Sequence, residues 1–167
     1  METLEKKITR GAEFIIKQTD CKDVFTPEDF TEEQKMMKEA VHDFAEKEIW
    51  SKKSEFEKHN YDLTFDVIKK AGELGFLGIG VPEEYGGLGM SFTSSMLVCD
   101  YISGSSGSTS TAYGAHTGIG TFPILLYGNE EQKKKYIPKL ASGEHIGAYC
   151  LTEPSAGSDA NNGKTKA

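Results

Sequence analysis

Cysteine is scarce in this sequence, and the residue types that bind metals are not grouped. The three cysteines, Cys21, Cys99 and Cys150, lie far apart and form no Cys-x-x-Cys pair. An odd number of widely spaced cysteines argues against a disulfide framework or a zinc site. The four histidines also lack the paired spacing of a zinc-binding helix. The sequence therefore predicts no metal centre and a reducing compartment, the cytoplasm, or the mitochondrial matrix for a eukaryotic chain.

Basic side chains are outnumbered by acidic ones, 19 to 26, which gives a formal net charge of −7. This balance argues against general attraction to nucleic acid or to an anionic membrane. Residues 101–129 carry no charge, but they include six glycines and many hydroxyl side chains, so no membrane span is expected. Met1 to Arg10 mixes Glu and Lys without an apolar core, so no export or organelle signal is expected either.

Apolar residues recur at helical spacing along most of the chain. Thr31 and Gln34 have the spacing of a capping box, and Thr26 precedes a proline at the start of a single turn. On the helix that starts at Ser91, Phe92, Met96, Cys99 and Ile102 are expected to point inward. The expected helices cover residues 31–53, 64–74, 91–103, 109–116 and 129–138.

Two glycine-rich stretches are compared with nucleotide-binding loops, and neither has the required spacing. Gly78-Ile79-Gly80 is followed by Pro82 where a dinucleotide fingerprint needs a running helix and a third glycine. Gly157 lies one residue too early to form a phosphate loop with Gly163-Lys164-Thr165. The sequence therefore argues against both nucleotide-binding motifs.

Near its end the chain changes from helical periodicity to a short strand and a polar loop. A strand is expected from His145 to Leu151, followed by a loop of Pro, Ser, Gly and Asp through Ala160. The hydroxyls and free amides of such a loop suit an anion or a flat polar ring. The domain organisation expected from these patterns is an N-terminal arm over 1–25, an all-α domain over 26–143, and the start of a truncated β domain over 144–167.

Three sequence motifs, at residues 82–89, 128–144 and 150–159, resemble motifs of the acyl-CoA dehydrogenase family and occur in the same order as in that family. The resemblance implies a mainly α fold, namely the family's N-terminal helical domain followed by the first strand of a β-barrel domain. The stretch Gly114-Ala115-His116 is most similar to the very-long-chain branch and its bacterial relatives. The family resemblance further implies FAD as cofactor, acyl-CoA as substrate and electron-transfer flavoprotein as electron acceptor.

The resemblance also assigns roles to individual residues. The residues that would bind FAD are Tyr149, Leu151, Thr152, Gly157 and Ser158. Ser158 would also contact the CoA moiety, and Gly114 and Ala115 would line the acyl tunnel. Simple helix packing is an equally good explanation for Gly114 and Ala115.

The activity implied by the resemblance is α,β-dehydrogenation of acyl-CoA thioesters in fatty-acid β-oxidation, carried out by an oligomeric enzyme. A carboxylate base removes the α-proton while the β-hydrogen leaves as hydride to the flavin. No Glu of this sequence matches the family's base, and Glu153 is interpreted as a turn residue. Two hypotheses remain: a portion of a complete homo-oligomeric dehydrogenase, or a non-catalytic helical domain or interaction module. The chain alone is expected to be inactive.

Overall fold

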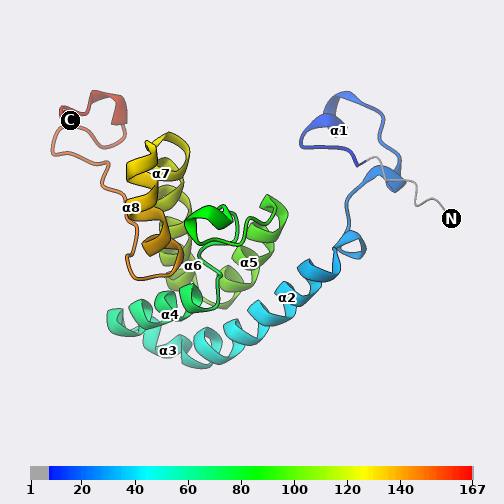
Figure 1. Cartoon of the computed structure of the whole chain (residues 1–167), viewed down its shortest axis with the longest axis horizontal. Coiled ribbons are helices and arrows are strands. Elements are labelled where there is room, and N and C mark those ends of the chain that lie inside the picture. Colours follow the sequence, from blue (N-terminus) through cyan, green and yellow to red (C-terminus); the bar gives the residue numbers. More distant parts are fainter. Residues whose placement is uncertain (1–7, 167) are drawn as a thin grey trace. The chain divides into compact units, whose positions relative to one another are not determined.

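The structure is a computed structural model that describes residues 8–166 (Figure 1). The expectations for the first ten residues and for Ala167 therefore fall wholly or partly outside the described residues. The mainly α fold class is confirmed. In chain order the elements are α1 Glu13–Ile16, η1 Cys21–Asp23, η2 Pro27–Asp29, α2 Glu32–Phe44, η3 Ala45–Ile49, η4 Trp50–Lys52, α3 Lys53–Phe56, α4 Tyr61–Glu73, η5 Glu83–Tyr85, α5 Phe92–Ser105, α6 Gly107–Gly114, η6 Ala115–Thr121, α7 Phe122–Tyr127, α8 Glu130–Ala141 and η7 Ala160–Asn162.

The chain forms two compact units, divided between Met36 and Met37 inside α2. In the first unit, the backbone N–H of Thr26 donates to the Asp29 carboxylate at 2.8 Å and starts the single turn η2. Thr31 and Gln34 then form the expected capping box, with reciprocal backbone-to-side-chain bonds of 3.0 and 3.2 Å. The predicted domain boundaries at residues 25 and 143 stay predictions.

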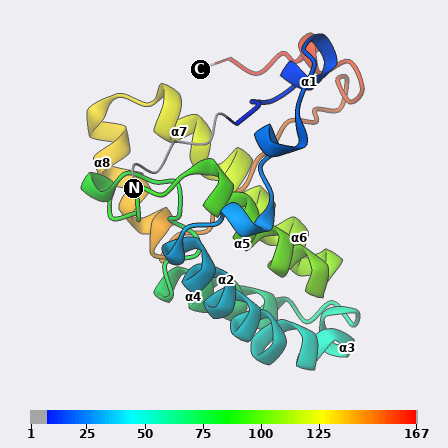
Figure 2. The same cartoon turned by 90° about the vertical axis from the view of Figure 1, so that its right-hand side faces the viewer.

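In the second unit, the main hydrophobic core collects apolar side chains from α2 through α6. Helix α6 packs against both α5 and α4 (Figure 2). The Tyr113 hydroxyl on α6 donates to the Phe76 carbonyl at 2.8 Å, so a buried phenol keeps its hydrogen bond. The buried members of this core are Val41, Phe44, Ile49, Phe56, Val67, Ile68, Ala71, Phe76, Leu77, Ile79, Val98, Ile102 and Tyr113.

A second hydrophobic cluster joins α8 to the loop around η5. It contains Val81, Tyr85, Ile137, Leu140 and Ala141, which are all buried. The expectation that this helix ends near Pro138 is wrong, because α8 continues to Ala141. Burial of Leu140 and Ala141 stabilises the extra turn against the loss of one backbone donor at the proline.

Two other expectations for the second unit need correction. Helix α4 begins at Tyr61 rather than at Thr64, because the Asn60 side chain accepts from the Leu63 N–H at 3.1 Å and caps the helix earlier. The strand expected over residues 145–151 is not formed in the described part of the chain. A strand needs a second strand to pair with, and the bridge found in residues 8–166 joins Glu153 to Ala156 instead. The His145 N–H donates to the Lys139 carbonyl and the Gly147 N–H to His116, so these two amides are bonded to helical residues.

Candidate functional site

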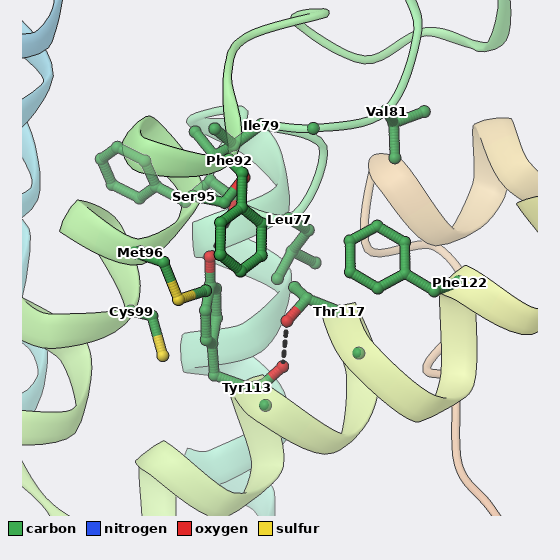
Figure 3. A pocket seen from close by; sticks show the side chains of 14 residues that line it. Leu77, Ile79, Val81, Phe92, Ser95, Met96, Cys99, Tyr113, Thr117 and Phe122 are labelled. Carbon is green, nitrogen blue, oxygen red and sulfur yellow. Dashed lines mark hydrogen bonds between the residues drawn. The ribbon is translucent and has the colours of Figure 1, made fainter. Parts of the chain in front are cut away.

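An apolar cavity of about 150 Å³ lies in the second unit (Figure 3). Its wall comes from the segment that follows α4, from α5 and α6, and from the helical turns at η6 and the start of α7. The lining residues are Phe76, Leu77, Ile79, Gly80, Val81, Phe92, Ser95, Met96, Cys99, Tyr113, Gly114, Thr117, Gly118 and Phe122. The lining is dominated by aromatic and aliphatic side chains, which suits a hydrocarbon group.

Two hydroxyl groups on this wall are hydrogen-bonded within the protein. The Thr117 hydroxyl donates to the Tyr113 carbonyl at 2.9 Å (Figure 3), and the Tyr113 hydroxyl donates to the Phe76 carbonyl. Burial raises the pKa of the Tyr113 phenol well above its usual value, so this group stays protonated. The wall therefore presents neutral side chains.

The sequence pattern predicted that Phe92 and Met96 point into the core, and this prediction is wrong. Both line the cavity, and 69% of Phe92 and 45% of Met96 is exposed (Figure 3). The buried residues of α5 are Ser94, Val98 and Ile102, so the prediction is confirmed for Ile102, and Cys99 packs against the core as predicted. The sequence pattern could not separate the core from the cavity wall, because both are lined by apolar residues.

The two predicted tunnel residues lie at the end of α6 and the start of η6. Gly114 lines the cavity, and a Cβ atom built on it would meet no heavy atom within 4 Å. Ala115 is partly exposed and opens η6 without being among the lining residues. A methyl group at position 114 would thus take up space at the cavity without a close contact.

The five predicted flavin residues lie together in the segment that follows Gly147. All of them are exposed, with 52% of Tyr149 and 48% of Leu151 accessible. Figure 1 shows this segment leaving the helices after α8. A Cβ atom on Gly157 would meet nothing within 4 Å, so its backbone is open to close approach. These residues form an open surface rather than an enclosed pocket.

Glu153 closes the loop of this segment. Its backbone pairs with Ala156 in an isolated bridge, with N–H to O distances of 3.0 and 3.1 Å. Its carboxylate accepts the backbone N–H groups of Lys164 at 2.7 Å and Thr165 at 3.0 Å, and these bonds lower the pKa of Glu153. The carboxylate is therefore ionised and engaged in local structure, as a turn residue would be.

His116 is a residue to which the sequence pattern assigned no role, and it is completely buried. Its Nδ1 accepts the Gly147 N–H at 2.9 Å, and its Nε2 lies 3.0 Å from the Leu140 carbonyl oxygen. Burial lowers the pKa of the imidazole, and the bond to Leu140 offsets part of that effect. Its place in the uncharged run 101–129 was the available signal, because a histidine in a buried helix needs partners for its ring nitrogens.

None of the helices in residues 8–166 has the length and hydropathy of a transmembrane segment. The same residues hold no group of three or more His, Cys, Asp or Glu side chains that could bind a metal ion.

Comparisons with known proteins agree on one family. The family model for "Acyl-CoA dehydrogenase, N-terminal domain" matches residues 31–144. A probable acyl-CoA dehydrogenase of Bacillus subtilis (strain 168) is 49% identical over 160 residues, which cover 96% of this chain and 27% of that protein. The crystal structure of acyl-CoA dehydrogenase complexed with FAD from Bacillus anthracis matches with a TM-score of 0.84 and 47% identity, covering 92% of this chain and 27% of that one.

A solved structure described as the electron transferring flavoprotein of Acidaminococcus fermentans is also similar. It matches with a TM-score of 0.75 and 40% identity over 82% of this chain and 36% of that one. The chain thus spans between 27% and 36% of the length of these three proteins.

Proposed function

The chain belongs to the acyl-CoA dehydrogenase family, and we propose that it forms the N-terminal helical domain of an FAD-dependent enzyme that dehydrogenates acyl-CoA thioesters. The observation that carries this proposal is the apolar cavity, whose lining residues all fall inside the range matched by the family model. In this proposal the domain receives the distal part of the acyl chain. The segment over residues 149–158 supplies one side of the flavin site.

The size and chemistry of the cavity support an acyl group. A cavity of about 150 Å³ with an apolar lining is known to stay dry and to take up benzene, so this cavity suits a hydrocarbon of about six carbons. Gly114 leaves the space open, and a role of Ala115 in the acyl tunnel stays a prediction. The similarity to the very-long-chain branch stays a prediction.

The exposed segment has the donor and apolar groups that FAD needs. Tyr149 and Leu151 would lie along the ring, and the Thr152 hydroxyl would meet its polar edge. Gly157 and Ser158 would approach the pyrophosphate, with Ser158 also reaching the CoA moiety. When bound, FAD supplies the acceptor for the β-hydrogen, which no side chain of the protein can supply. The half-exposed state of Tyr149 and Leu151 supports a site completed by residues from outside this segment.

A second functional hypothesis concerns the general base that removes the α-proton. The residues that line the cavity include no Asp or Glu, and a general base must come within hydrogen-bond reach of the proton that it removes. The Glu153 carboxylate is already bonded to Lys164 and Thr165. We therefore propose that this chain by itself is a non-catalytic helical domain that neither turns over acyl-CoA nor retains FAD.

The wider setting of the complete enzyme is proposed on similarity. We propose fatty-acid β-oxidation as its process, a homo-oligomer as its form, and the cytoplasm or mitochondrial matrix as its compartment. Electron-transfer flavoprotein is the proposed acceptor on the same similarity to the family.

A chimera tests the proposal. This chain would replace the matching N-terminal part of the Bacillus anthracis acyl-CoA dehydrogenase, to which it is 47% identical. We expect a yellow protein that reduces a dye with acyl-CoA, while the chain alone stays colourless and inactive. A Gly114→Leu chimera should keep its flavin but shift its preference to shorter acyl groups, because the added side chain fills the cavity. A folded chimera without acyl-CoA activity would overturn the proposal.

A further inference from the structure

Three segments that are distant in the sequence meet at the buried ring of His116. The ring belongs to η6, the Leu140 carbonyl to the last turn of α8, and the Gly147 N–H to the start of the exposed segment. Because Nδ1 accepts a hydrogen bond from Gly147, the proton of the neutral ring must be on Nε2, which donates to Leu140. A single side chain thus ties η6, α8 and the exposed segment together.

The backbones of η6 and the exposed segment also touch at this point. A Cβ atom on Gly120 would lie 2.7 Å from the carbonyl carbon of Gly147, and a Cβ atom on Gly147 would lie 3.0 Å from the Gly120 Cα. The Thr121 hydroxyl donates to the His116 carbonyl at 2.7 Å and holds the turn that carries the ring. The contact between Gly120 and Gly147 keeps the exposed segment close to η6, and the bond to His116 orients the Gly147 backbone.

The same turn contributes to the cavity. Thr117 and Gly118, the two residues after His116, line its wall, and the segment held by the ring continues into residues 149–158. We propose that His116 is a positioning residue that fixes the direction in which the chain leaves the helical domain at Gly147. Resting on the proposed function, the consequence is that the flavin-binding segment is held in register with the acyl cavity.

A matched pair of substitutions separates the two bonds of the ring. In His116→Asn, the side-chain oxygen takes the place of Nδ1 and keeps an acceptor for Gly147. In His116→Gln, the side-chain nitrogen takes the place of Nε2 and keeps a donor for Leu140 but offers Gly147 no acceptor. Gly147 amide exchange and 15N relaxation over residues 148–158 would be measured by NMR on the chain itself.

We expect the Gly147 amide to exchange at least about tenfold faster in His116→Gln than in His116→Asn, which corresponds to about 1.4 kcal/mol of lost protection. Fast motion of residues 148–152 should increase only in His116→Gln. His145→Gln, at an exposed neighbouring histidine, should change neither. Equal protection of Gly147 in the two His116 variants would overturn the proposal.

The unsubstituted chain provides a test that needs no variant. The 15N shifts of the His116 ring should show the proton on Nε2 and an unprotonated Nδ1 near neutral pH. A proton on Nδ1 would contradict the proposal even if both variants failed to fold. Because the sample contains no flavin, these results are independent of the chimera, whose failure would affect only the proposed function.

Discussion

Tyr85 and Glu130 are joined by a hydrogen bond of 2.9 Å between the phenol and the carboxylate, although 45 residues separate them. The bond ties η5 to the first turn of α8, at the edge of the cluster formed by Val81, Ile137 and Leu140. It raises the pKa of Tyr85 to about 12 and lowers the pKa of Glu130. The loop that supplies Val81 to the cavity is therefore anchored on α8.

Tyr85→Phe should lower the melting temperature by about 2–4 °C at neutral pH. The Glu130 pKa is lower in the folded chain than in the unfolded chain, so its contribution is fully present above about 4.5 and is lost as the pH falls through the folded value. The melting temperatures of Tyr85→Phe and of the unsubstituted chain should thus differ at pH 7 and converge as the pH falls through the folded pKa of Glu130. A gap that stays constant with pH would show that the carboxylate is not the partner.

Two buried threonines should respond in opposite ways to the same substitution. The Thr109 hydroxyl is buried and has no hydrogen-bond partner in the part of the chain that the structure describes, whereas the Thr121 hydroxyl donates to the His116 carbonyl. Thr109→Val should stabilise the chain by about 1 kcal/mol, and Thr121→Val should destabilise it by about 1–2 kcal/mol. Urea midpoints at unchanged m-value measure both changes. A loss of stability in both variants would contradict the expectation for Thr109.

Gly87 and Gly104 form a second matched pair. A Cβ atom on Gly87 would lie only 2.1 Å from the backbone oxygen of Val81, whereas one on Gly104 in α5 would meet nothing within 4 Å. Gly87→Ala should lower the free energy of unfolding by about 1–3 kcal/mol or more, because the added methyl group overpacks the contact. Gly104→Ala should raise the free energy of unfolding by up to about 1 kcal/mol, because alanine has the higher helix propensity. Chemical denaturation would compare the two. Equal effects would mean that the contact between Gly87 and Val81 is not maintained in solution.

The stability of the chain should fall at mildly acidic pH because of His116. Its pKa is lowered by burial, so between the folded value and about 6.5 the unfolded chain binds a proton that the folded chain does not. The contribution is fully present above about 6.5 and is lost as the pH falls toward the folded value, with a slope of at most about 1.4 kcal/mol per pH unit.

Urea unfolding between pH 5 and 7 would measure this dependence. His116→Asn should flatten the profile, because asparagine does not titrate, while His145→Gln serves as the control at an exposed position. A His116→Asn profile as steep as that of the unsubstituted chain would assign the dependence to other groups.

Local signals in the sequence were sufficient for much of the fold. Capping at Thr31 was readable because this helix start satisfies its own backbone groups within three residues. The order of the three motifs at residues 82–89, 128–144 and 150–159 identified the family. The role of Gly114 in lining an acyl tunnel stays a prediction, which its position on the cavity wall supports. These features depend on residues that are neighbours in the chain.

Other features depend on contacts that no local pattern contains. Helix α8 passes Pro138 because Leu140 and Ala141 are buried against distant residues. Residues 145–151 form no strand because no strand in the described part of the chain pairs with them, and the N–H groups of His145 and Gly147 bond to helical residues. The sequence by itself thus determined the helical class, the Thr31 cap and the family of this chain. Only the tertiary structure decided the cavity wall and the buried bonds of His116, because burial and long-range hydrogen bonds exist only after the helices have packed.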